Sequence, residues 1–288
     1  MAQTTPGKIM GIDPIFPRPE VTGRQAYAPG IKVSRDMDLV FFSGITAYPP
    51  EIDPWNPGTF KLPEDPAERS KMATDNLDRL LKAAGITWQH IIFNVNYTAP
   101  GGGGINFRSQ TGDWSPCSTS LRVADTGVPG ATALYQVTAA APRKALTSRG
   151  TVPGIEPILP RPDMSLKDLP SAPAIRVSSD VDLVYFSAVT AYPLNVDPWN
   201  PGAFKLSEDL GMQERMVADN IDRMLKASGI TWQHIILLAR IGEVSGVSSM
   251  MRDRLGDWRP CRTTRAVSTG IPGAKVMCEI TAVAPRRA

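Results

Sequence analysis

Hydrophobic residues change their spacing along the first half of the chain in an order that predicts alternating strands and helices. Residues 38–48 are rich in β-branched and aromatic side chains and end at two prolines, which is typical of a strand. The apolar positions then recur with helical spacing between Asp65, which can cap a helix, and Gly85, which can end one. Residues 91–98 predict a further strand, because the run is too short and too rich in β-branched residues for a helix.

The second half of the chain repeats this pattern. The segment that begins at Asp182 matches the one that begins at Asp38, and 230–236 matches 86–92, both at an offset of 144 in a chain of 288 residues. A helical stripe again ends at Gly229, and strands are predicted at 235–241, 263–269 and 275–283, the last two joined by a turn. We therefore predict a tandem duplication with domains at 1–148 and 149–288. The order of elements favours an α+β fold, with helices on one face of a mainly antiparallel sheet.

Composition narrows the classes of partner. The formal net charge is +3, and apart from Arg286 and Arg287 no run of Lys or Arg could follow a phosphate backbone, so nucleic acid is not favoured. No apolar run is long enough to span a membrane, and the first twenty residues lack the apolar stretch of a secretory signal. We expect a soluble cytoplasmic protein without a membrane partner.

Cysteine and histidine usage limits the chemistry. The three cysteines lack C-x-x-C spacing, which argues against a disulfide framework and a structural zinc site. The two histidines of the sequence, His90 and His234, occupy the same place in the two copies, and this favours a shared structural role. So few imidazoles also argue against Ser-His-Asp triads, Cys-His dyads and multi-histidine metal sites. We expect no metal site.

Two charged residues near the end of the second copy form the candidate chemical site. Glu279 is a carboxylate within an otherwise apolar predicted strand, and Arg262 begins the strand before it, so the two could meet at one end of the sheet. The corresponding residues of the first copy are Gln136 and Ser118, so both charges are lost together and the fold does not need them. An ion pair that only fixes strand register and a pair that performs a reaction both remain open.

The motifs of the second copy resemble those of the RidA (YjgF-like) family of enamine/imine deaminases. The strongest is Pro-x-Arg at 260–262, followed by a Gly-Ile-Pro-Gly-Ala turn and by Glu-Ile-Thr-Ala-Val-Ala from Glu279; Ser43-Gly44 and the helix-ending glycines also fit. The resemblance covers essentially the whole chain, as two domains in a row. It implies chorismate-mutase-like α+β domains, active sites in clefts between neighbouring domains, assembly into trimers, and no cofactor.

The same resemblance implies roles for individual residues. Arg262 matches the arginine that holds the substrate carboxylate, for which a planar and permanently charged guanidinium is suited. Glu279 matches the acid that positions water and exchanges protons with the leaving amine. Ser43 and Ser187 match a serine in the pocket wall, and Thr264 stands where many members have cysteine.

The second copy departs from the family pattern at two positions. It has Ala188 in place of glycine, and Ser171 where the first copy keeps a tyrosine, Tyr27. Neither copy alone holds the full set of residues. The working site is therefore either built mainly from the second copy or composite, across an interface between unlike copies, to which Arg122 of the first copy could also contribute.

These residues predict a hydrolytic deaminase that acts without metal or cofactor. The carboxylate of a 2-amino-2-enoate or its imine would bind Arg262, water positioned by Glu279 would add to the C=N carbon, and ammonia would leave. Three further arginines in segments expected to flank the cleft favour a substrate with more than one carboxylate, and 2-aminomuconate fits this best among the family's substrates. They are Arg240, Arg254 and Arg265, for which solvated surface is the alternative interpretation.

We also consider two other functions, and we predict how the chains assemble. A non-catalytic sensor or regulatory protein that binds a small acid is suggested by the missing tyrosine and by Ala188. Ribonuclease activity, which is sometimes attached to the family, is disfavoured because the charge is mild and no aromatic and basic track is evident. Since three chains supply six domains, we expect a homotrimer with two trimeric rings of domains, or a dimer of such trimers.

Overall fold

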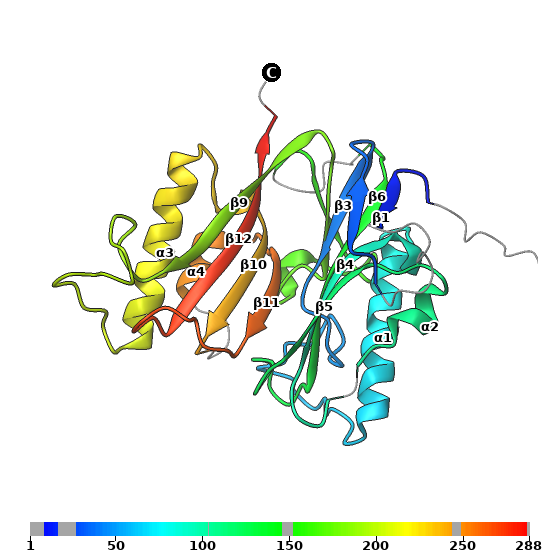
Figure 1. The fold of residues 1–288 in the computed structure, drawn as a ribbon, viewed down its shortest axis with the longest axis horizontal. Coiled ribbons are helices and arrows are strands. Elements are labelled where there is room, and N and C mark those ends of the chain that lie inside the picture. Colours follow the sequence, from blue (N-terminus) through cyan, green and yellow to red (C-terminus); the bar gives the residue numbers. More distant parts are fainter. Residues whose placement is uncertain (1–8, 17–26, 103, 146–151, 244–248, 287–288) are drawn as a thin grey trace, which may run out of the picture.

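The computed structural model describes residues 9–16, 27–102, 104–145, 152–243 and 249–286. Two sheets lie side by side, with helices α1 and α3 on the two outer flanks (Figure 1). This arrangement confirms the α+β class. In the part of the chain described, no helix is both long enough and apolar enough to cross a membrane.

Each copy contributes the same series of strands and α-helices. The first copy contains β1 (Ile12–Ile15), β2 (Gly30–Val33), β3 (Met37–Phe42), α1 (Pro66–Ala83), a 3₁₀ turn (Trp88–His90), β4 (Ile91–Thr98), α2 (Phe107–Thr111), β5 (Cys117–Arg122) and β6 (Ala133–Pro142). The second contains β7 (Ile155–Ile158), a 3₁₀ turn (Leu166–Asp168), β8 (Ala174–Val177), β9 (Val181–Thr190), α3 (Leu210–Ala227), a 3₁₀ turn (Trp232–His234), β10 (Ile235–Gly242), α4 (Ser249–Leu255), β11 (Cys261–Arg265) and β12 (Val276–Pro285).

The two long helices begin and end where the sequence predicts. The Asp65 carboxylate accepts a hydrogen bond from the Ala67 N–H at 2.9 Å, and Asp209 caps α3 in the same way. Gly85 and Gly229 follow the helix ends at a φ of +70°, a backbone conformation that favours glycine. The apolar stripe of each helix is buried against its sheet.

The sheets differ from the expectation in how the last strands pair. The strand orders are β5-β4-β6-β3-β8-β7 and β11-β10-β12-β9, and the pairs β4–β5 and β10–β11 are parallel. β11 and β12, which the sequence suggests as neighbours joined by a turn, each pair with β10 and not with each other. The strand expected at 38–48 is also shorter: β3 ends at Phe42, and Ile45 makes an isolated bridge to Tyr135.

A hairpin of the second copy completes the sheet of the first. β8 pairs with β3 from Leu39 opposite Val177 to Phe42 opposite Ala174, and β7 forms the outer edge. Arg176 of this hairpin lies 3.4 Å from the Asp38 carboxylate, and both side chains are buried. Sheet membership therefore crosses the boundary expected at 148/149.

The histidines hold the turns that precede the strands β4 and β10. The N–H groups of Thr87 and Thr231 donate to Nδ1 of His90 and His234, at 3.1 and 3.2 Å. Each ring is hydrogen-bonded to the backbone of its own turn, which agrees with the structural role expected for both histidines.

Candidate functional site

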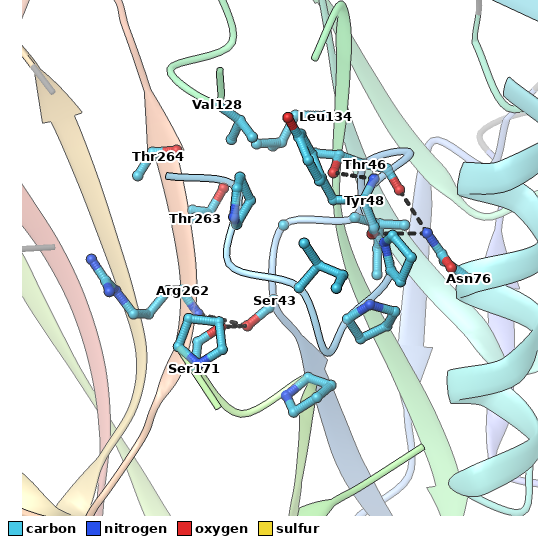
Figure 2. A pocket seen from close by; sticks show the side chains of 18 of the residues that line it. Ser43, Thr46, Tyr48, Asn76, Val128, Leu134, Ser171, Arg262, Thr263 and Thr264 are labelled. Carbon is cyan, nitrogen blue, oxygen red and sulfur yellow. Dashed lines mark hydrogen bonds between the residues drawn. The ribbon is translucent and has the colours of Figure 1, made fainter. Parts of the chain in front are cut away.

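The two copies meet where β3 of the first ends and β11 of the second begins. The Ser43 hydroxyl accepts a hydrogen bond from the Arg262 N–H at 2.8 Å and donates to the Ala172 carbonyl at 2.6 Å. The Gly44 N–H donates to the Arg262 carbonyl at 2.7 Å, and the Ser171 hydroxyl lies 3.2 Å from that of Ser43 (Figure 2). Serine and glycine of one copy are therefore fixed against the arginine segment of the other.

A small hollow opens at this contact and is lined by both copies. Its volume is about 90 Å³. Asn76 of α1 fixes one wall, because its amide donates to the backbone carbonyls of Thr46 and Tyr48 at 3.1 and 2.9 Å. The polar lining residues are Ser43, Thr46, Tyr48, Asn76, Ser171, Arg262, Thr263 and Thr264, and none of the described lining residues is an Asp or Glu.

The side chain of Arg262 points away from the two serines (Figure 2). In the sheet register Arg262 lies beside Leu238, so its side chain emerges on the face that α3 and α4 cover. Burial lowers the pKa of Arg262 to about 10, and the nearby Arg240 and Arg252 contribute. The guanidinium nevertheless stays protonated at neutral pH.

Arg262 belongs to a cluster of three arginines. Arg252, Arg259 and Arg262 line a shallow hollow together with Pro170. Arg259 is held by the carbonyls of Gly256 and Trp258, and among the residues described none of the three arginines has an Asp or Glu within ion-pair distance. The cluster is therefore suited to an anion from outside the chain.

Sequence reasoning missed Arg252 and Arg259, although one signal was present. The segment Arg-Pro-Cys-Arg at 259–262 stands where the first copy has Ser-Pro-Cys-Ser at 115–118. Two serine positions carry arginine in the second copy, and two positive charges at that spacing indicate a site more strongly than Arg262 alone.

Glu279 does not meet Arg262, which corrects the pair suggested by the sequence. Glu279 lies opposite Ala239 on β10, whereas Arg262 lies beside Leu238, and successive residues of a strand face opposite sides. Arg265 instead holds Glu279 at 3.0 Å and also donates to the Gln136 amide oxygen at 2.7 Å. The candidate acid therefore faces the first copy, on the side of the sheet away from the arginine cluster.

The register also fixes how the two copies correspond at this position. Gln136 lies opposite Val95, as Glu279 lies opposite Ala239. The offset is 144 for the β4 and β10 residues but 143 for Gln136 and Glu279, because the first copy has one more residue between its last two strands. Glu279 and Gln136 are thus structurally equivalent.

The three arginines expected to add free positive charge are all paired with acidic groups. Arg240 is buried with Glu214 of α3, Arg254 binds Asp219 and Asp222 at 2.6 and 2.5 Å, and Arg265 binds Glu279. Acidic side chains of the protein compensate their charge. The three arginines are therefore neither free positive charges beside the cleft nor ordinary solvated surface residues. By contrast, Arg252, Arg259 and Arg262 have no Asp or Glu within ion-pair distance among the described residues.

The remaining predicted site residues are divided between two places. Thr264 is buried at the contact between copies, where its hydroxyl donates to the Gly127 carbonyl at 3.3 Å. Ser187, Ala188 and Tyr27 are exposed, and none of them is among the residues that line the hollow at Ser43 and Arg262. Ala188 and Glu279 share a separate open hollow of about 280 Å³.

The thiols and possible metal ligands add no further candidates. Burial raises the pKa of Cys278 to about 12 and also raises that of Cys261. Within the described ranges no group of three or more His, Cys, Asp or Glu side chains could hold a metal ion.

Comparison with known proteins gives structural relatives. No protein-family model and no curated protein matches the chain. Many similar solved structures are RidA/YjgF-family proteins. YyfB of the Rid family from Yersinia pestis, of unknown function, has 15% identity and a TM-score of 0.35 over 45% of this chain and 98% of its own. A YjgF-family protein from Neisseria meningitidis has 19% identity and a TM-score of 0.28 over 47% and 98%. RidA from an Antarctic Psychrobacter has 19% identity and a TM-score of 0.30 over 36% and 86%.

Proposed function

We propose that the protein binds a small organic acid at an arginine cluster of its second copy and hydrolyses the imine or enamine form of that acid. The observation that carries the proposal is the cluster of Arg252, Arg259 and Arg262, which has no acidic partner among the described residues. A guanidinium binds a carboxylate through two parallel hydrogen bonds, and the flanking arginines suit a second carboxylate. For this reason 2-aminomuconate remains the candidate substrate.

The reaction needs little from the protein beyond positioning. The imine carbon is already electrophilic; a water molecule adds its oxygen to that carbon, its two protons pass to nitrogen, and ammonia leaves as the 2-oxo acid forms. Arg262 would hold the carboxylate. Glu279 lies on the opposite face of the sheet, so it cannot exchange protons with a substrate that Arg262 holds. The Glu279→Gln variant tests whether the reaction uses a cleft on that other face instead.

A second candidate function is binding without turnover, as in a sensor of a 2-oxo acid. The observation that favours it is the lining of the hollow between the copies, which includes hydroxyls and Arg262 but no carboxylate among the described residues. Such a lining can bind an acid, but it offers no carboxylate or imidazole that could act as a general base.

Ammonia release from enzymatically generated 2-aminomuconate separates the two functions. We expect turnover by the wild type, a loss of at least tenfold with Arg262→Ser, and a loss with Glu279→Gln if that acid exchanges the proton. Each substitution copies the residue of the first copy, so the fold should tolerate it. Arg215→Ser, at an exposed position of α3, is the matched control and should keep full activity.

The other outcomes have definite meanings. Absence of turnover in the wild type, combined with binding of a 2-oxo dicarboxylate that Arg262→Ser abolishes, would reject the deaminase and favour the sensor. Equal turnover by Glu279→Gln and wild type would remove Glu279 from the mechanism. Absence of both turnover and binding would reject both functions.

A further inference from the structure

Helix α4 presents two arginines on opposite flanks. Met251 and Leu255, which lie four residues apart, are buried in the core of the second copy. Arg252 and Arg254 lie two residues apart, which on an α-helix is a rotation of about 200°. Since the apolar face of α4 is buried, one arginine points to each side of it.

Arg254 faces α3 and binds two of its carboxylates. Its guanidinium donates to Asp219 at 2.6 Å and to Asp222 at 2.5 Å. The same guanidinium lies 5.9 Å from the centre of the Trp232 ring, whose indole N–H also donates to Asp222. Because one planar guanidinium bridges two carboxylates that lie three residues apart, these bonds fix the rotation of α4 more firmly than a single ion pair would.

Arg252 faces the other way, toward the cluster that is proposed to bind the substrate. It lines the shallow hollow together with Arg259 and Arg262. Burial is the main cause of the lowered pKa of Arg259 and of Arg262, and in both cases the positive charge of Arg252 contributes. The three like charges repel one another, so other contacts must hold Arg252 and α4 in place when no anion is bound.

The first copy keeps the two carboxylates but not the arginine that binds them. Asp75 and Asp78 of α1 stand at the corresponding positions, and lysines of the same helix bind them. Gln110 stands where the second copy has Arg254. In the described part of the first copy, no ion pair joins α2 to α1.

Arg254 is found in the copy that also has the cluster. Position 252 carries arginine in both copies, because its counterpart is Arg108. Arg254, Arg259 and Arg262 are found in the second copy alone, where the first copy has a glutamine and two serines. The arginine that holds α4 against α3 therefore accompanies the two arginines that make the other flank of α4 strongly positive.

We propose that Arg254 is a positioning residue, which holds Arg252 beside Arg262 and thereby makes the site prefer acids with two carboxylates to acids with one. This role rests on the proposed function, in which Arg262 binds the first carboxylate of the acid. Arg252 binds the second carboxylate. Arg254 touches neither carboxylate, because its guanidinium faces α3.

Two stable 2-oxo acids of equal length test this selectivity. 2-Oxoadipate has a carboxylate at each end, and 2-oxohexanoate has a methyl group in place of the distant carboxylate. We expect wild type to bind 2-oxoadipate at least tenfold more tightly in isothermal titration calorimetry, since the second carboxylate adds charge-assisted hydrogen bonds. Arg252→Ala should reduce this ratio of dissociation constants to about one.

Arg254→Gln, which copies the residue of the first copy, should lower the ratio at least threefold although Arg254 does not contact the acid. The effect is smaller than that of Arg252→Ala, because Asp219 and Asp222 are about half exposed and solvent screens their bonds. Arg215→Gln removes the same charge from an exposed position of α3 and is the matched control, which should keep the wild-type ratio. A residue that only stabilised the fold would change the unfolding midpoint but not this ratio.

The double variant Asp219→Asn, Asp222→Asn separates positioning from long-range electrostatics. It removes two negative charges, so electrostatics alone would strengthen the binding of 2-oxoadipate. Asparagine keeps an oxygen that can accept from Trp232, so that contact is preserved. Release of α4 should instead weaken the binding of 2-oxoadipate and lower the ratio at least threefold. Stronger binding or an unchanged ratio would overturn the proposal.

Failure of this role and failure of the proposed function give different results. If wild type binds neither acid, or if Arg262→Ser binds 2-oxoadipate as tightly as wild type, the cluster is not the site and both proposals are wrong. If Arg262→Ser abolishes binding but Arg254→Gln keeps the wild-type ratio, the cluster binds the acid and only the role of Arg254 is wrong.

Discussion

The backbone N–H of Arg262 donates to the hydroxyl of Ser43 at 2.8 Å, although the two residues belong to different copies. The residue proposed to hold the substrate is thus positioned by the opposite copy. Because the same hydroxyl donates to the Ala172 carbonyl, Ser43 satisfies one donor and one acceptor of the second copy. A change at this contact should therefore alter both the stability of the interface between the copies and the geometry of the site.

Ser43→Ala should therefore weaken both. Removing the hydroxyl leaves the Arg262 N–H and the Ala172 carbonyl without their partner, which costs about 1–3 kcal/mol for a buried group. We expect this decrease in the free energy of unfolding in urea, together with weaker binding of the carboxylate. Ser171→Ala, which removes a single longer contact of 3.2 Å, is the control and should cost clearly less. Equal costs for the two variants would contradict the assigned role.

Because Arg240 and Glu214 form a buried pair, we expect a single substitution to lower the free energy of unfolding much more than the double substitution does. The first copy has Asn96 and Ser70 at these positions, so the fold accepts a neutral pair. Glu214→Ser leaves a buried guanidinium without its carboxylate and should cost about 3–5 kcal/mol, whereas the double variant Arg240→Asn, Glu214→Ser should recover much of that loss. Urea unfolding of wild type, the two single variants and the double variant measures this, and additive losses would show that the residues are not coupled.

Arg265 links three residues of the two copies and should be coupled to Gln136. It donates to Gln136 and to Glu279, and it lies 5.1 Å from the centre of the Tyr97 ring. Since Glu279 is half exposed, solvent screens that ion pair, and the contact to Gln136 should dominate. A double-mutant cycle with Arg265→Leu and Gln136→Leu should give a coupling of about 0.5–1.5 kcal/mol. A coupling near zero would mean that this bond does not hold the copies together.

The histidine turns predict a loss of stability on mild acidification. Burial lowers the pKa of His90, with a contribution from the nearby Arg176, and burial also lowers that of His234. A histidine with a lowered pKa in the folded state binds more protons when unfolded, so stability falls as the pH drops through the unfolded value of about 6.5. The loss ends below the folded pKa.

Thermal unfolding at several values between about pH 7.5 and 5.5 checks this prediction. The midpoint of wild type should fall with pH more steeply than that of the double variant His90→Gln, His234→Gln. The double variant should also be less stable at the upper pH, because it loses the ring acceptors for Thr87 and Thr231. Parallel pH profiles would show that other groups control acid stability.

Local signals allowed much of the fold to be predicted. The helix ends at Asp65 and Gly85 follow from side-chain capping and from the backbone freedom of glycine, both of which depend on nearby residues. The separation of Arg262 from Glu279 could not be predicted in this way. It depends on β10 lying between β11 and β12, and this is a pairing of distant segments.

The sequence by itself determined the duplication, the α+β elements, and the presence in the second copy of charges that the first copy lacks. Spacing along the chain records these features directly. The tertiary structure alone decided that β8 completes the sheet of the other copy, that Ser43 and Arg262 form one wall, and that Arg240, Arg254 and Arg265 are already paired. The strands β3 and β9 have nearly the same sequence, so only the packing of the whole copies determines that the β7–β8 hairpin joins β3.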